Sequence, residues 1–139
     1  MIKKKPMDKK RTILIIEDEA ALLEVLSDKL TREGFTIVKG KDGIEGLKLA
    51  QKNVPDLILL DIVMPTMDGV SMLKKLREDK RTENIPVIII SNLSEIERIT
   101  SILQAKKGVI EHIVKSHWSM EGLVDKIKKT LKVYDMLSQ

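Results

Sequence analysis

The amino-acid sequence predicts an α/β fold with a doubly wound parallel sheet of five strands. Short apolar runs alternate five times with segments whose apolar residues recur at helical spacing. Three of these runs, residues 13–16, 57–60 and 87–90, are apolar without a break, as strands covered on both faces are. Strict alternation of strand and helix predicts a parallel sheet with helices on both faces.

The individual elements follow from these patterns in chain order. Strands are expected at residues 12–16, 35–38, 56–60, 87–90 and within 109–114. Each helix carries an apolar stripe with a spacing of three or four residues, which is expected to face the sheet. The stripes are Leu22, Leu26 and Leu30; Ile44 and Leu47; Val70, Leu73 and Leu76; Ile96, Ile99 and Leu103; and Leu123, Ile127 and Leu131.

Polar residues and a glycine mark the predicted helix ends. Asp42 and Ser119 are placed to cap the second and the last helix, and Ser94 with Glu97 has the spacing of a capping box. Gly34 is the stop signal of the first helix. These signals divide the chain into five strand–helix pairs.

The second strand is the most polar of the five. It includes Thr36 and is followed by Lys39, which suits the edge of a sheet. We therefore predict an open, flavodoxin-like sheet with the strand order 2-1-3-4-5. In such sheets the functional site lies beyond the carboxyl ends of the strands, where the order reverses, here between strands one and three.

Acidic residues follow the two strands at this point. Glu17 and Asp18 follow strand one, and Asp61 follows strand three. Three carboxylates at one crevice repel each other and resist ionisation. A hard divalent cation resolves this conflict, and Mg²⁺ binds through one or two carboxylates while keeping waters that a phosphate can replace. The sequence therefore predicts a Mg²⁺ site here.

Two further strand ends carry groups that bind phosphate. Ser91 supplies a hydroxyl at the end of strand four, and Lys115 supplies a cation at the end of strand five. Taken singly, each of these residues has an ordinary explanation, as a helix cap, a loop hydroxyl or a solvated lysine. Their joint position on one edge of the sheet favours a socket that stabilises a transferring phosphoryl group.

Composition excludes several classes of protein. The chain of 139 residues has no cysteine, so it forms no disulfide, and its apolar runs are too short to span a bilayer. The net charge of +4 comes largely from basic residues within 1–11, which we expect to be a flexible arm before a single folded domain, 12–139. We find no secretion signal, separate effector domain or nucleic-acid reading element, and expect a cytoplasmic protein that binds no membrane.

Four segments resemble the receiver domain of two-component response regulators, in its stand-alone, single-domain form. They are "ILIIEDEA", "DLILLDIVMPTMDG", "IPVIIISN" and "IEHIVKS", and the resemblance covers about residues 11–131. It implies a signalling domain, rather than an enzyme with turnover, that accepts a phosphoryl group from a histidine kinase or phosphotransfer protein. The output then passes to a downstream protein, a second copy or a further relay.

The resemblance also implies a role for each site residue. Asp61 is the phosphoacceptor and Asp18 the direct Mg²⁺ ligand, while Glu17 holds waters of the ion. The backbone carbonyl of Val63 completes the ion's protein ligands. Lys115 pairs with a phosphoryl oxygen, and Ser91 moves to bind another, which makes Ser91 a switch residue.

The sequence departs from the family pattern at three positions. Ser116 stands where a proline usually follows the lysine, and Asn92 follows Ser91 where a smaller residue is common. His112 replaces the usual tyrosine or phenylalanine three residues before Lys115, so an imidazole is the candidate switch side chain, with a surface histidine as the alternative.

Three other functions are compatible with parts of the pattern. A haloacid-dehalogenase-type phosphatase has an acid–base Asp two residues after its nucleophile, where this chain has Val63. A pseudo-receiver that only binds partners would not need the set of carboxylates, hydroxyl and lysine. A flavodoxin-type nucleotide-binding domain has a phosphate loop after strand one, where Glu17 and Asp18 repel phosphate.

Overall fold

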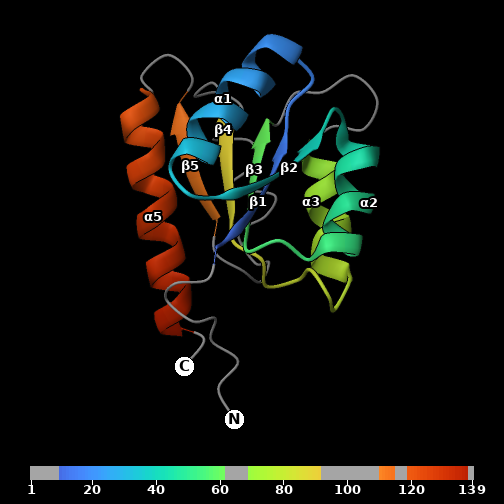
Figure 1. The fold of residues 1–139 in the computed structure, drawn as a ribbon. Coiled ribbons are helices and arrows are strands. Elements are labelled where there is room, and N and C mark those ends of the chain that lie inside the picture. The colour runs from blue at the N-terminus through green and yellow to red at the C-terminus, as the bar shows by residue number, and fades with distance from the viewer. Residues whose placement is uncertain (1–9, 62–68, 92–109, 115–118, 138–139) are drawn as a thin grey trace.

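The computed structural model describes residues 10–61, 69–91, 110–114 and 119–137. Its strands form one parallel sheet of order β2-β1-β3-β4-β5, which confirms the predicted fold and strand order (Figure 1). The strands are β1 (Thr12–Ile16), β2 (Thr36–Gly40), β3 (Leu57–Asp61), β4 (Val87–Ser91) and β5 (Ile110–Val114). The described helices are α1 (Ala20–Arg32), α2 (Gly43–Asn53), α3 (Gly69–Glu78) and α5 (Met120–Leu137). The predicted fourth helix, with Ser94, Ile96, Glu97, Ile99 and Leu103, lies outside the described residues.

Helices cover both faces of the sheet. Helices α1 and α5 lie on one face, and α2 and α3 lie on the other (Figure 1). In β1, Ile13 and Ile15 pack into the apolar cluster under α1 and α5, while Leu14 and Ile16 pack into the cluster under α2 and α3. Strand β3 alternates in the same way. Burial on both faces explains why these strands are apolar without a break.

Strands β2, β3 and β4 begin or end later than the sequence pattern predicts, and β4 includes Ser91. Strand β2 starts at Thr36 rather than Phe35, because the Phe35 amide donates to the Leu30 carbonyl at the end of α1 and is not free for the sheet. Strand β3 includes Asp61, which pairs in register with Ile90 of β4. The acidic residue is therefore held in the hydrogen-bonded sheet and not in the following loop.

The predicted capping of α2 is confirmed, but the orientation predicted for Ile44 is wrong. Asp42 Oδ1 accepts a hydrogen bond of 2.8 Å from the Glu45 amide. Ile44 is 43% exposed, whereas Leu47 packs partly buried against the core. The helix approaches the sheet through small residues, so the large apolar side chain at 44 is on its outer side. The buried residues of α2 are Gly43, Gly46 and Ala50.

Two further sequence signals for helix ends, Ser119 and Gly34, agree with the structure. Ser119 Oγ accepts a hydrogen bond of 3.1 Å from the Gly122 amide at the start of α5. Gly34 follows α1 with a φ of +98°, a left-handed conformation that glycine adopts without steric cost. Helices α1 and α5 are thus delimited by the residues that the sequence indicated.

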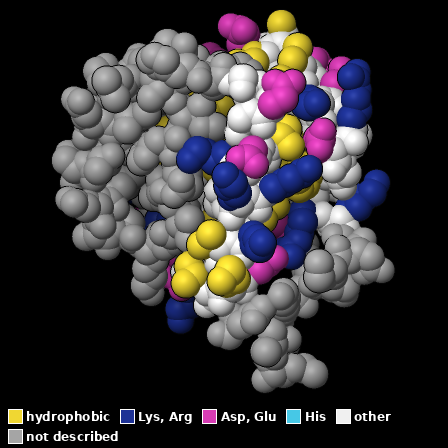
Figure 2. Space-filling model, turned by 90° about the vertical axis from the view of Figure 1, so that its left-hand side faces the viewer, with side chains coloured by type: hydrophobic (Ala, Val, Ile, Leu, Met, Phe, Trp, Pro, Cys, Tyr) yellow, Lys and Arg dark blue, Asp and Glu magenta, His cyan; other side chains and the backbone are white. Residues whose placement is uncertain are grey.

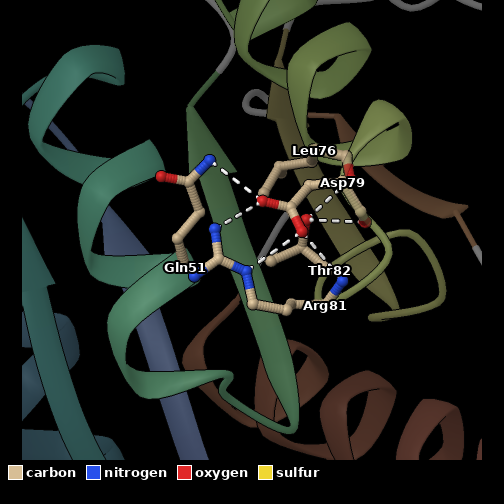
Figure 3. A network of polar contacts seen from close by, with 5 residues as sticks. All are labelled: Gln51, Leu76, Asp79, Arg81 and Thr82. Atoms are coloured by element: carbon tan, nitrogen blue, oxygen red, sulfur yellow. Dashed lines mark hydrogen bonds and ion pairs between the residues drawn. The ribbon is translucent and has the colours of Figure 1, made fainter.

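A polar network ties α2 to the turn after α3 (Figure 3). Arg81 donates to the Asp79 carboxylate from Nε and Nη2, at 3.1 and 2.8 Å, and Gln51 of α2 donates to it at 3.2 Å. The bonds from Arg81, together with its charge, lower the pKa of Asp79 to about 2. The Thr82 hydroxyl donates to the Leu76 carbonyl at 2.7 Å. Because both helices end here, this network holds the edge of the molecule opposite the carboxyl ends of the strands.

Helix α5 joins α1 through charged side chains and exposes apolar ones near its end. Lys128 forms an ion pair of 3.0 Å with Glu33, which follows α1. Figure 2 shows lysines and acidic residues interspersed over this side, with apolar side chains gathered at its lower end. Val133, Met136 and Leu137 of the last turns of α5 are 48–71% exposed. Among the described helices, none combines the length and the apolar character needed to cross a lipid bilayer.

Candidate functional site

Three carboxylates meet at the carboxyl ends of β1 and β3. Ile16, the last residue of β1, pairs in register with Leu60, so Glu17 and Asp18 emerge beside Asp61. Each side chain offers one oxygen, and these oxygens all lie within 4.8 Å of one another. The structure therefore brings together the acidic cluster (Glu17, Asp18 and Asp61) that strand order and strand ends predicted.

The three carboxylates differ in their exposure to solvent. Glu17 is only 3% exposed and Asp61 only 4% exposed, whereas Asp18 is on the surface. The acidic cluster thus has a buried side formed by two carboxylates and an open side at the third. Asp18 is therefore the carboxylate of the cluster that lies on the solvent side.

Backbone groups fix the position of Glu17. Its amide donates to the carbonyl of Gly40, the last residue of β2, at 3.0 Å. Its side-chain Oε2 accepts a hydrogen bond of 3.1 Å from the Glu19 amide, directly before α1. Unpaired amides at a helix start favour negative charge. Glu17 is therefore held by hydrogen bonds to both its backbone amide and its side-chain carboxyl.

The environment of Glu17 opposes its ionisation. Burial raises the pKa of Glu17 from 4.5 to about 8; the Glu19 amide counters this rise, and the negative charge of Asp61 adds to it. Without a cation, the surroundings of Glu17 therefore favour its protonated form. A bound divalent cation would compensate the charge of all three groups, and an all-oxygen donor set with two buried carboxylates and an open side fits Mg²⁺.

The described residues place Ser91 and His112, but not the other predicted site residues. Ser91 is the last residue of β4, at the same sheet edge as Asp61, and pairs in register with Val114 of β5. His112 lies in β5 and pairs with Ile89. Nothing in the described part of the chain tests the side chains of Ser91 and His112, so their switch roles stay predictions. Outside the described residues lie Val63, Asn92, Lys115 and Ser116.

Sequence reasoning missed the support behind the acidic cluster. Gly46 of α2 packs directly on Ile16, the residue before Glu17, and also lies against the backbone of Gly40. The available signal was a glycine inside a helical pattern, which often marks a close approach of two backbones. A search for large apolar residues overlooks this glycine, and such a search led to the wrong prediction that Ile44 faces the sheet.

Comparison with known proteins identifies the family. The model of the response regulator receiver domain matches residues 13–128. The chain belongs to this family. Receiver domains take part in two-component signalling, where they work with histidine kinases and downstream effectors.

Curated relatives carry this domain within longer proteins. The transcriptional regulator RpaA of Synechocystis sp., described as DNA-binding, is 32% identical over 127 residues, which are 91% of this chain and 52% of RpaA. Histidine kinase P4 of Formosa agariphila is 37% identical over 106 residues, 76% of this chain and 8% of the kinase. The chain thus spans about half the length of RpaA and a small part of the kinase.

Solved receiver domains have the same fold. The receiver domain of Francisella response regulator 1452 superposes with a TM-score of 0.76 at 28% identity, over 88% of this chain and 98% of that domain. The receiver domain of the Pseudomonas aeruginosa sensor histidine kinase PA1611 gives 0.77 at 22% identity, over 89% and 99%. That structure is described with a magnesium ion coordinated in its active site cleft.

Proposed function

We propose that this receiver domain accepts a phosphoryl group on Asp61. The observation that carries the proposal is the position of the Asp61 carboxylate, which ends a buried strand within 4.8 Å of oxygens from two other carboxylates. Asp61 is held by the sheet, and the exposed Asp18 gives the cluster an open side. This is the arrangement expected for a fixed nucleophile that receives its substrate from solvent.

The proposed transfer is an in-line displacement at phosphorus. An Asp61 oxygen attacks the phosphorus of a phosphohistidine, and the bond from phosphorus to the imidazole nitrogen breaks. The electron pair of that bond stays on the nitrogen. If the phosphohistidine ring is protonated before transfer, the released imidazole is neutral. If the ring is not protonated, the released nitrogen takes up a proton. Asp61 becomes an acyl phosphate. A small acyl phosphate donates in the same way, with a carboxylate as leaving group.

The residues present fit a Mg²⁺ ion. Asp18 and Asp61 would be its direct carboxylate ligands, with the Val63 carbonyl, and Glu17 would hold its waters. When bound, the ion supplies charge compensation for the carboxylates and for the phosphoryl oxygens. The magnesium ion described for the PA1611 receiver domain supports this assignment. The hydrogen bond from the Glu19 amide to Glu17 and the pairing of Asp61 within the sheet support this assignment, because both would limit the movement needed to bind the ion.

The other proposed roles follow from positions in the fold. Ser91 ends β4 next to Asp61 of β3, and Lys115 directly follows β5. Ser91 would donate a hydrogen bond to one phosphoryl oxygen and Lys115 would pair with another. The move of Ser91 toward the phosphoryl group, and a linked change at His112, would report phosphorylation to a downstream protein or second copy. The chain is then a switch and not an enzyme that turns over a separate substrate.

Intact-protein mass spectrometry tests the proposal. The chain is incubated with acetyl phosphate or phosphoramidate and Mg²⁺, beside the variant Asp61→Ala and a sample containing a chelator. We expect the wild type to gain the mass of one phosphoryl group, and the variant and the chelated sample to gain none.

A result without mass gain has two possible sources, a binding-only pseudo-receiver and hydrolysis faster than the measurement. Beryllofluoride separates them, because it is a stable mimic of the acyl phosphate. If it shifts the amide NMR signals around Asp61 only when Mg²⁺ is present, the site is competent and hydrolysis is fast. If it shifts none, the proposed function is wrong.

A further inference from the structure

We propose that Gly46 of α2 is a positioning residue for the acidic cluster. Its missing side chain lets Ile16 settle at the end of β1, and Ile16 in turn fixes Glu17 and Asp18. The inference rests on the proposed function for the role of Mg²⁺, although the contacts that carry it involve only residues of this chain.

The contact between Gly46 and Ile16 leaves no room for a methyl group. A Cβ built on Gly46 would lie 2.5 Å from Cδ1, 2.8 Å from Cγ1 and 3.2 Å from Cγ2 of Ile16. Ile16 is only 1% exposed and belongs to the buried core cluster that also contains Leu60 and Leu73. A methyl group at 46 therefore requires the buried Ile16 side chain, helix α2 or the end of β1 to shift.

The same glycine also contacts the second support of Glu17. A Cβ on Gly40 would lie 3.3 Å from the Gly46 Cα, so the two backbones are close together. The Gly40 carbonyl accepts the hydrogen bond of 3.0 Å from the Glu17 amide. Helix α2 thus packs against both residues that position Glu17. These are Ile16, which precedes it in the chain, and Gly40, whose carbonyl accepts its amide hydrogen bond.

Small shifts at this point reach the carboxylates directly. Ile16 is covalently followed by Glu17 and Asp18, and metal ligands must be held within about 0.5 Å of their working geometry. Groups that orient metal ligands typically change metal affinity by about 10- to 100-fold when they are altered. A purely structural role of Gly46 would instead lower stability and leave the affinity of the folded protein unchanged.

The test compares Gly46→Ala with a variant that is destabilised elsewhere. Leu131→Ala removes a core side chain on α5, in the apolar cluster on the opposite face of the sheet from α2. Mg²⁺ affinity is measured by calorimetry at a temperature where both variants are folded. We expect Gly46→Ala to weaken Mg²⁺ binding by about tenfold, and Leu131→Ala to bind Mg²⁺ as the wild type does. Equal affinities for Gly46→Ala and the wild type would overturn the proposal.

A rescue variant shows whether the effect passes through Ile16. Ile16→Ala removes the three side-chain atoms that lie nearest to a Cβ at 46. The double variant Gly46→Ala with Ile16→Ala should bind Mg²⁺ at least as tightly as Ile16→Ala alone. This comparison also decides the question if Gly46→Ala by itself does not fold. A double variant that binds about tenfold more weakly than Ile16→Ala would contradict the proposed route.

Amide NMR spectra without Mg²⁺ separate this inference from the proposed function. We expect the signals of Glu17, Asp18 and Asp61 to shift in Gly46→Ala and to return toward their original positions in the double variant. Unmoved signals would overturn the positioning role. If the signals move in this way but the wild type binds no Mg²⁺, the proposed function fails while the positioning of the cluster by Gly46 stands.

Discussion

Replacing Glu17 with glutamine is expected to stabilise the metal-free protein at pH 8.5. The Glu17 carboxyl is buried beside Asp61, and its pKa is raised to about 8. A rise of this size from 4.5 corresponds to a ceiling of about 5 kcal/mol of stability lost on ionisation. Because a buried amide also needs hydrogen-bond partners, we expect a gain of about 2 kcal/mol in the free energy of unfolding. Urea unfolding in the presence of a chelator measures it.

The pH dependence has a definite sign. The folded protein binds the Glu17 proton more tightly than the unfolded chain does. The contribution of Glu17 to the stability of the wild type is therefore greatest below pH 4.5. It declines as the pH rises toward about 8 and is then constant. The variant Glu17→Gln should lack this decline. A saturating concentration of Mg²⁺ should also remove most of it from the wild type, because a cation beside Glu17 favours the ionised carboxylate and so reduces the rise in its pKa.

The exposed Glu19 provides the matched control. Its carboxyl lies two residues beyond Glu17 and is not part of the acidic cluster. Glu19→Gln should leave both the stability at pH 8.5 and its pH dependence close to those of the wild type. Equal stability of Glu17→Gln and the wild type at pH 8.5 without metal would contradict the account of the buried carboxyl.

Replacing Asp18 with asparagine is expected to weaken Mg²⁺ binding while changing the stability of the metal-free protein little. Asp18 is exposed, so its loss changes the stability of the metal-free protein little. It is the proposed direct ligand on the open side, and Mg²⁺ depends on one or two such carboxylates. We therefore expect Mg²⁺ affinity to fall by at least about tenfold, and phosphorylation by acetyl phosphate to slow in parallel at subsaturating Mg²⁺. Calorimetry and the initial rate of mass gain measure the two effects.

The same Glu19→Gln variant separates ligand loss from a change in surface charge. It removes one negative charge next to the cluster without removing a proposed ligand. If Asp18→Asn and Glu19→Gln weaken Mg²⁺ binding equally, Asp18 acts only through its charge, and its assignment as a direct ligand is wrong.

The sequence predicted the sheet and the acidic cluster because both depend on patterns along the chain. Unbroken apolar runs mark strands that are buried on both faces, and alternation with helices fixes a parallel order. Once strands one and three are neighbours, Glu17 and Asp61 must meet at their carboxyl ends. No side-chain contact has to be known for this conclusion.

Burial and close packing could not be predicted in the same way. Glu17 and Asp18 are consecutive, yet one is buried and the other exposed, because neighbouring residues after a strand point to different sides. The packing of α2 through Gly46, with Ile44 outside, depends on how closely two backbones approach. That distance is set by tertiary packing and not by the spacing of apolar residues. The roles of Ser91, His112 and Lys115 stay predictions.

The most direct measurement of the central claim identifies the phosphorylated residue. Borohydride reduces an acyl phosphate to an alcohol, so a phosphorylated aspartate becomes homoserine. Tryptic cleavage after Lys52 and Lys74 yields a peptide with three candidates, Asp56, Asp61 and Asp68. Fragment masses of this peptide after phosphorylation with Mg²⁺ should place homoserine at position 61 alone. Homoserine at 56 or 68, or in another peptide, would contradict the assignment of Asp61 as the phosphoacceptor.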